Sequence, residues 1–177
     1  MTNLADHLRT VRDFPRKGIL FYDISPLLDD PVAFREAVDS LCARCEANGF
    51  SRGVTKICAV EARGFLFAPA MAYRMGWGVV PIRKPGKLPW KTIHETYDLE
   101  YGSSELHVHA DAIGNEDTVL LFDDLLATGG TAAAMARLVR RLGGRIAGVQ
   151  FLAELTFLNG RKMLRDCPVD SLIRIDE

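Results

Sequence analysis

Short apolar runs that alternate with helical segments are the feature that most constrains the fold of this chain. The apolar runs cover residues 56–60, 78–82, 118–122 and 145–153, and helical patterns cover residues 31–48, 64–75 and 131–142. Strands that are apolar along their whole length are typical of a parallel sheet that helices cover on both faces. The sequence therefore predicts an α/β fold with a central, mostly parallel sheet flanked by helices.

The remaining segments do not follow this alternation. Residues 3–11 are predicted to form a helix because apolar residues recur on one side, and residues 13–26 are predicted to form an ordered loop. Residues 83–94 contain four Lys or Arg residues and form a long polar stretch, which in a compact domain is usually functional or disordered. Residues 96–101 and 105–109 alternate like the arms of a hairpin.

Length and composition limit the classes of protein that the chain can belong to. With 177 residues, 48% of them hydrophobic, residues 1–177 are expected to form a single domain with a substantial core. The net charge of −1 is not that of a typical nucleic-acid binder. No apolar run reaches the roughly 18 residues of a membrane span, and no signal peptide is visible at the start. We therefore expect a cytoplasmic protein without a nucleic-acid or membrane partner.

The cysteines and histidines do not indicate a metal or redox centre. Cys42 and Cys45 have C-x-x-C spacing, but a zinc site needs a second pair or nearby histidines. A redox pair lies at a strand-to-helix turn, whereas this pair lies within a helical pattern and is expected to be buried. His107 and His109 share one face of a strand, and a third metal ligand is not evident.

The strongest functional signal follows the strand predicted at residues 118–122. Asp123 and Asp124 come directly after it, and Thr-Gly-Gly-Thr at residues 128–131 begins the next helix. Ligands of open α/β sheets bind beyond the carboxyl ends of the strands, and a glycine-rich helix N-terminus suits a phosphate. The acids would repel that phosphate but can accept hydrogen bonds from sugar hydroxyls. The pattern predicts a ribose 5-phosphate site; alternatively, the acids cap a turn and the glycines are only a connector.

The run from Val119 to Thr131 resembles the phosphoribosyl-pyrophosphate (PRPP) motif of type I phosphoribosyltransferases, in the version typical of members that act on adenine. The resemblance extends in order over nearly the whole chain, from Val11 to Leu164. It implies the type I phosphoribosyltransferase fold, with a small N-terminal hood region and a flexible catalytic loop and hairpin. The matching blocks are Phe14-Pro15, Gly18–Phe21, Asp23–Pro26, Glu61–Phe67, Arg83–Pro89 and Tyr97–Gly102.

The resemblance implies a purine salvage enzyme that transfers the 5-phosphoribosyl group from PRPP to adenine and releases AMP and pyrophosphate. It also implies a homodimer, and a Mg²⁺ ion that PRPP carries and that no protein side chain binds directly. Two alternatives stay open: transfer to another purine-like base, and a non-catalytic regulator that senses PRPP. A regulator of this kind usually has a DNA-binding domain or a basic surface, and this length and charge favour neither.

The resemblance assigns PRPP-binding roles to cations and to the motif. Arg63 is expected to contact the pyrophosphate, because a planar guanidinium can bind two oxygens at once, and Glu61 to hold Arg63 or its loop. Lys84 and Lys87 are expected to fold over the pyrophosphate, and Arg83 to reach a partner subunit; alternatively, all these cations are solvated surface charges. The expected PRPP-binding set is Arg63, Arg83, Lys84, Lys87, Asp123, Asp124, Ala127, Thr128, Gly129, Gly130 and Thr131.

The resemblance places the purine near Leu20, Phe21 and Leu155, where the Phe21 ring can stack on the base; alternatively, Phe21 belongs to the core. Ala127 stands where hypoxanthine–guanine relatives have an aspartate that faces the base. This alanine favours adenine as the substrate. Since Ala127 has no proton to transfer, Glu100 is the candidate for handling the proton of the purine imidazole.

The expected catalytic set is Glu100, Tyr101 and Arg63, with Tyr101 positioning the pyrophosphate or the loop. The chain departs from the family pattern at Tyr22, where arginine is usual, at Lys17, where proline is usual, and at Ala68, where glycine is common. These departures leave the expected PRPP-binding residues unchanged and fall mainly near the expected base site.

Overall fold

The computed structural model describes residues 3–98 and 103–176. The chain forms two compact units, Met1–Ser40 and Leu41–Glu177. The expectation of one domain over residues 1–177 stays a prediction. The first unit contains η1 (Leu4–His7), β1 (Arg9–Arg12), β2 (Leu20–Asp23), α1 (Ser25–Asp29) and the first part of α2 (Pro31–Ala47).

The first unit is built on an antiparallel pair of strands, in which Arg9 lies opposite Asp23 and Arg12 lies opposite Leu20. Hydrogen bonds from Ser25 and Arg9 lower the pKa of Asp23 to about 2. The predicted helix over residues 3–11 is wrong, because only Leu4–His7 is helical and Arg9–Arg12 is a strand. The predicted loop over residues 13–26 contains the partner strand β2. The pairing of β1 with β2 across the intervening turn determines the structure of both segments. The periodicity of one segment alone does not reveal this pairing.

The second unit contains a parallel sheet of five strands in the order β4-β3-β7-β8-β9. The predicted central sheet is therefore confirmed, with two of its predicted strands extended at their carboxyl ends and β9 not predicted. The strands are β3 (Lys56–Val60), β4 (Gly78–Ile82), β7 (Thr118–Leu126), β8 (Arg145–Leu155) and β9 (Val169–Ile175).

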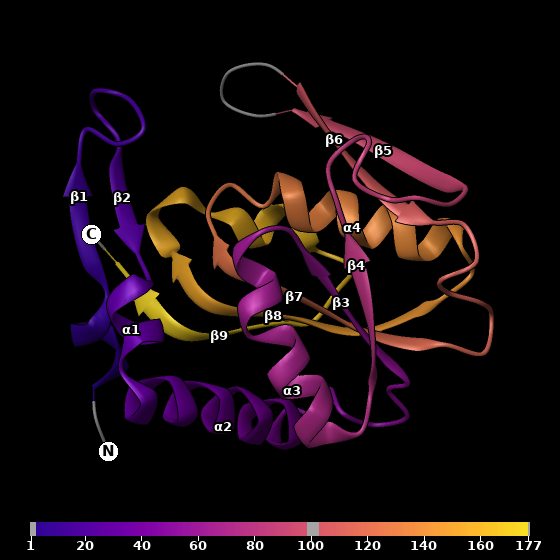
Figure 1. The fold of residues 1–177 in the computed structure, drawn as a ribbon, viewed down its shortest axis with the longest axis horizontal. Coiled ribbons are helices and arrows are strands. Elements are labelled where there is room, and N and C mark those ends of the chain that lie inside the picture. Colours follow the sequence, from indigo (N-terminus) through magenta and orange to yellow (C-terminus); the bar gives the residue numbers. More distant parts are fainter. Residues whose placement is uncertain (1–2, 99–102, 177) are drawn as a thin grey trace. The chain divides into compact units, whose positions relative to one another are not determined.

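Helices cover both faces of this sheet, with α3 (Ala68–Met75) on one face and α4 (Gly130–Arg141) on the other (Figure 1). A hairpin of β5 (Thr92–Asp98) and β6 (Ser103–His109) packs on the side of α4 that faces away from the sheet. The predicted helix at residues 64–75 is divided into η2 (Arg63–Leu66) and α3. The polar stretch is shorter than predicted, because β5 already begins at Thr92.

The core of the second unit lies between the sheet and α4. Side chains of the central strand, such as Leu121, pack with Met135 and Leu138 of α4 and with Leu106 of the hairpin, and all of these are almost completely buried. Burial of this apolar surface holds α4, and therefore its N-terminus, in a fixed place on the sheet.

The cysteine pair is buried within α2, as predicted. Burial raises the pKa of Cys45 to about 12, so this thiol is not a reactive one. Within residues 3–98 and 103–176, the structure has no helix that combines the length and the apolar character of a membrane span.

Candidate active site

Four neighbouring parallel strands end at one edge of the sheet, and most of the predicted site residues follow these ends. Residues 61–63 follow β3, residues 83–87 follow β4, and residues 127–131 follow β7, while Leu155 is the last residue of β8. Because ligands of such sheets bind beyond the carboxyl ends of the strands, this edge is the expected ligand site.

Asp123 and Asp124 were predicted to follow the strand directly. They lie within β7 instead, because the strand continues to Leu126. Asp124 is only 4% exposed, and its carboxylate lies 2.7 Å from Nε of Arg63. The amide of Asp124 donates to Oδ1 of Asp123 over 2.8 Å. Gly64 lies so close that a Cβ there would be 3.3 Å from the Asp123 carboxylate. The structure thus brings the acid pair and Arg63 together.

The position of the acids makes them difficult to ionise. Burial raises the pKa of Asp123 well above its usual value, and the neighbouring Asp124 carboxylate raises it further. Burial also raises the pKa of Asp124, although Arg63 opposes this effect. Two adjacent buried acids cost folding stability, and such pairs are typical of functional sites.

A small hollow of about 60 Å³ lies at the N-terminus of α4. Gly129 precedes the helix with φ of +87°, which glycine adopts readily, and no side chain caps the helix in this part of the described chain. The first backbone N–H groups of α4 therefore remain available for an anion. The hollow is lined by Asp123, Leu125, Leu126, Ala127, Thr128, Gly129, Gly130, Thr131, Ala132 and Phe151.

The loop that forms this hollow packs backbone to backbone against η4 (Gly160–Leu164). A Cβ on Gly129 would lie 2.3 Å from the carbonyl oxygen of Gly160, and a Cβ on Gly160 would lie 2.2 Å from that of Ala127. Side chains at these two positions are therefore excluded while the backbones keep this contact. The predicted site included Gly129, but no sequence pattern indicated that Gly160 lies behind it.

Glu61 holds the start of the polar loop. Its carboxylate accepts from Arg83 Nε and from the Lys84 amide, each over 2.7 Å, and Arg83 also donates to the Lys87 carbonyl oxygen over 3.1 Å. Burial alone would raise the pKa of Glu61, but these contacts lower it. Arg83 thus pairs within its own chain, and its predicted role at a partner subunit stays a prediction. The Lys84 and Lys87 side chains are exposed.

The other predicted residues fall in different parts of the chain. In the first unit, Leu20 is exposed, and Phe21 is half-buried with its ring 5.0 Å from that of Phe14. In the second unit, Leu155 is buried at the end of β8. Glu100 and Tyr101 lie outside the described residues. The base-binding and catalytic roles of these residues stay predictions.

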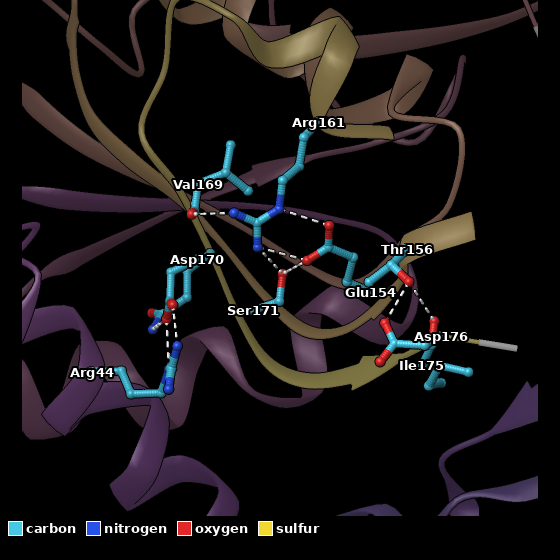
Figure 2. A network of polar contacts seen from close by, with 10 residues as sticks. Arg44, Glu154, Thr156, Arg161, Val169, Asp170, Ser171, Ile175 and Asp176 are labelled. Atoms are coloured by element: carbon cyan, nitrogen blue, oxygen red, sulfur yellow. Dashed lines mark hydrogen bonds and ion pairs between the residues drawn. The ribbon is translucent and has the colours of Figure 1, made fainter. Parts of the chain in front are cut away.

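The structure also contains a polar network near this edge that the sequence did not indicate (Figure 2). Glu154, at 3% exposure, accepts from Nε and Nη2 of Arg161 and from the Ser171 hydroxyl, each over 2.7 Å. Arg161 also donates to the Val169 carbonyl oxygen over 3.0 Å. Glu154 lies in the strand β8 and Arg161 in the short helix η4, so the periodicity of a single helix or strand does not link them.

The described residues contain no group of three or more His, Cys, Asp or Glu side chains arranged to hold a metal ion. The acids of the site are a pair, Asp123 and Asp124, and a carboxylate pair can hold a divalent cation only together with other oxygen ligands.

Comparison with known proteins gives consistent matches. The model of the phosphoribosyl transferase domain family matches residues 28–170. Adenine phosphoribosyltransferase from Thermotoga neapolitana is 50% identical over 171 residues, which cover 97% of this chain and 98% of that protein.

Two solved structures are also similar. The adenine phosphoribosyltransferase from Thermoanaerobacter pseudethanolicus has a TM-score of 0.93 and 48% identity, covering 97% of this chain and 98% of that one. The enzyme from Saccharomyces cerevisiae, solved with adenine and an imino-altritol bisphosphate, has a TM-score of 0.91 and 38% identity, covering 96% of both chains.

Proposed function

Because the chain belongs to the phosphoribosyltransferase family and its relatives are adenine phosphoribosyltransferases, we propose that the edge of the sheet described above is the site of this reaction. The protein is a purine salvage enzyme that transfers the 5-phosphoribosyl group of PRPP to adenine, giving AMP and pyrophosphate. One observation carries the assignment of the site: an uncapped helix N-terminus with a hollow lies beside a buried acid pair. The fold is that of the type I phosphoribosyltransferases, as the sequence predicted.

The hollow at residues 127–131 binds the 5′-phosphate of PRPP. The free N–H groups of α4 and its partial positive charge stabilise the phosphate, and the hydroxyls of Thr128 and Thr131 add donors. Asp123 and Asp124 accept hydrogen bonds from the ribose hydroxyls, since charged acceptors form stronger hydrogen bonds than neutral ones. The ribose is thereby held with its anomeric carbon toward the pyrophosphate and base sites.

Cations bind the pyrophosphate. The Arg63 side chain is 32% exposed, so it can contact the pyrophosphate while it remains paired with Asp124. Lys84 and Lys87 extend from a loop whose start is fixed by Glu61, and they can close over the ligand. Closure excludes water, which would otherwise trap a cationic sugar. These contacts stabilise the charge that develops on the leaving pyrophosphate.

A Mg²⁺ ion fits this site when PRPP carries it. Magnesium in proteins usually keeps several waters and binds substrate phosphates, so the ion would be held by the oxygens of PRPP and by water, and the residues that bind PRPP, among them Arg63, Asp123 and Asp124, would hold it in the site only through that ligand. Its chemical contribution is to neutralise the charge of the departing pyrophosphate. The protein residues themselves bind the ribose, the 5′-phosphate and the pyrophosphate of PRPP.

Leu20, Phe21 and Leu155 contact adenine, and Phe21 stacks on it. Glu100 takes part in moving the proton of the purine imidazole while N9 attacks the anomeric carbon, with Tyr101 positioning the pyrophosphate. Ala127 adds no proton donor or acceptor, which favours adenine over hypoxanthine. We further propose that residues 1–177 act as a single domain, that the enzyme is cytoplasmic, and that it is a homodimer, as the sequence and the family resemblance suggest.

The test is to incubate the protein with PRPP, adenine and Mg²⁺ and to measure AMP and pyrophosphate by chromatography, for the wild type and for Glu100→Gln. We expect equal amounts of both products, and a kcat about 10²- to 10⁴-fold lower in the variant with PRPP affinity little changed, because acid–base assistance typically contributes this much. Glu105→Gln, in the same hairpin, is the control and should keep normal kcat. A Glu100→Gln enzyme with normal single-turnover rates would remove the catalytic role of Glu100.

A further inference from the structure

The segment between Glu154 and Arg161 joins two parts of the site. It starts beside Leu155, the proposed base contact, passes through η3 (Thr156–Leu158), and reaches Gly160 behind the phosphate hollow. Figure 2 shows Arg161 turned back onto β8, where its guanidinium meets the Glu154 carboxylate with two parallel hydrogen bonds. The ion pair between Glu154 and Arg161 therefore holds the two ends of the segment together.

Further hydrogen bonds in the described part of the chain fix this pair to the sheet. The Glu154 carboxylate also accepts from Ser171 of β9, and the Arg161 guanidinium also donates to the carbonyl oxygen of Val169 in the same strand. Thr156, within the segment, donates to the carbonyl oxygen of Ile175 over 3.1 Å. The segment therefore rests on β8 and β9.

At its far end the segment supports the phosphate loop directly. The backbones of Gly160, Ala127 and Gly129 approach so closely that a Cβ at either glycine would lie within 2.3 Å of a carbonyl oxygen. Arg161 is the next residue after Gly160, so a shift of Arg161 is transmitted to the loop without an intervening side chain. A loop that binds through backbone N–H groups depends on its backbone shape more than on its side chains.

We infer that Glu154 and Arg161 form a positioning pair, which holds Gly160 against residues 127–129 and so sets the shape of the phosphate hollow. The inference rests on the proposed function, in which this hollow takes the 5′-phosphate. Neither residue is catalytic, because neither lines the hollow. The chemistry requires arginine, since a lysine ammonium can bind one carboxylate oxygen but cannot span both oxygens and the Val169 carbonyl together.

The chain provides a matched control. Arg44 forms two hydrogen bonds to the Asp170 carboxylate, an ion pair on α2 and β9 that has no contact with the segment 155–161 among the described hydrogen bonds. The exposure of the two pairs is nearly equal, 46% and 9% for Arg44 and Asp170 against 43% and 4% for Arg161 and Glu154. Arg44→Gln therefore removes a similar pair and the same charge but none of the hydrogen bonds that hold Arg161 to Glu154 and Val169.

The experiment measures the dissociation constants of ribose 5-phosphate and of Mg²⁺-pyrophosphate by calorimetry, with melting temperatures, for the wild type, Arg161→Gln, Arg161→Lys and Arg44→Gln. We expect Arg161→Gln to bind ribose 5-phosphate about tenfold more weakly, by analogy with metal sites, where losing a residue that orients a ligand costs about 10- to 100-fold. Arg161→Lys should also bind it more weakly than the wild type, although its charge is kept. Pyrophosphate affinity should change less than twofold in every variant, and Arg44→Gln should bind both ligands normally.

Several results would overturn the inference: normal ribose 5-phosphate binding by Arg161→Gln, an equal loss of pyrophosphate affinity, normal binding by Arg161→Lys, or the same loss in Arg44→Gln. If Arg161→Gln does not fold, the comparison of Arg161→Lys with the wild type decides. A wild-type protein that does not bind ribose 5-phosphate would overturn the proposed function as well, whereas normal wild-type binding with an unaffected Arg161→Gln variant overturns the positioning role alone.

Discussion

Asp123 is the residue at which function and stability oppose each other most directly. Burial and the adjacent Asp124 raise its pKa, so its ionised form is unfavourable in the folded protein. A carboxyl whose folded pKa lies above the unfolded value of about 3.8 contributes most to stability below that value and loses the contribution as pH rises through the folded pKa. The wild-type protein therefore keeps an acid here at a cost in stability that increases with pH.

Asp123→Asn should accordingly gain stability relative to the wild type as pH rises from 4 toward 8, because asparagine does not ionise and its oxygen can still accept from the Asp124 amide. The same variant should bind PRPP more weakly, since a hydrogen bond to a charged acceptor is worth about 1.5–3 kcal/mol. Urea unfolding at both pH values and calorimetry with PRPP and Mg²⁺ would measure the two effects. Unchanged PRPP affinity would mean that Asp123 only shapes a turn.

Asp117 shows the opposite shift. A hydrogen bond from Lys56, together with bonds from the Gly114 amide and the Thr55 hydroxyl, lowers its pKa to about 2 although burial opposes this. Its stabilising effect is therefore present above pH 3.8 and is lost as pH falls toward 2.

Asp117→Asn should cost about 1–2 kcal/mol of unfolding free energy at pH 7, less than the full pKa shift implies because water screens part of the interaction. The difference from the wild type should shrink at pH 3. Denaturant unfolding at the two pH values measures it, and Asp111→Asn, at an exposed aspartate of the same connection, should have no effect at either. An equal difference at both pH values would show that the charge of Asp117 is unimportant.

Among the helices and strands, those whose own residue pattern determines their structure could be predicted. Those whose structure depends on contacts with a distant segment could not. The strands at residues 56–60 and 78–82 have the predicted bounds, because short continuous apolar runs are typical of strands in a covered parallel sheet. Strand β1 was predicted as part of a helix, since its pairing with β2 is not visible in either segment alone. Strand β9 contains Asp170, which pairs with Arg44, and Ser171, which donates to Glu154, and these polar residues break the apolar pattern.

The same distinction applies to the site. Residues 127–131 of the hollow could be predicted because the chemistry of a phosphate loop is contained in one continuous run, whereas Phe151, which lines the hollow from β8, was not predicted. The contacts of Arg63 with Asp124, of Glu61 with Arg83, and of Glu154 with Arg161 depend on how separate segments meet, and no spacing rule predicts them.

The polar loop after β4 should be fixed at its start and accessible farther along. Arg83 exchanges two backbone hydrogen bonds with His107 and is paired with Glu61, so its peptide bond should resist trypsin. Lys84 precedes a proline and should resist as well, and the carbonyl oxygen of Lys91 accepts from the Ala110 amide over 2.9 Å, which leaves the exposed Lys87 as the first expected cleavage site. PRPP with Mg²⁺ should protect Lys87 by closing the loop over the pyrophosphate.

Limited proteolysis with mass spectrometry would identify the cleavage sites with and without PRPP. Glu61→Gln should expose Arg83 to cleavage, because the variant loses the charged partner of the guanidinium. Cleavage at Lys87 that is equally fast with saturating PRPP and Mg²⁺ would argue against a closing loop and against the roles of Lys84 and Lys87.

For the whole molecule, selectivity for adenine over other bases is the property that most directly decides the proposed function. The PRPP residues lie in the second unit and match the family motif, whereas the departures at Lys17 and Tyr22 lie in the first unit, next to Leu20 and Phe21. Adenine accepts a hydrogen bond at N1 and donates one from its exocyclic amine, while hypoxanthine does the reverse at both positions. A site arranged for one base leaves buried groups unpaired with the other, at a cost of about 1–3 kcal/mol for each group.

The most direct measurement is therefore kcat/KM for adenine, hypoxanthine and guanine with PRPP and Mg²⁺ at saturation, with the nucleotide products identified by chromatography. We expect AMP to be formed from adenine at least tenfold more efficiently than the nucleotide of either other base, which corresponds to roughly the loss of one buried hydrogen bond. Equal efficiency with hypoxanthine, or no nucleotide from any of the three bases, would contradict it.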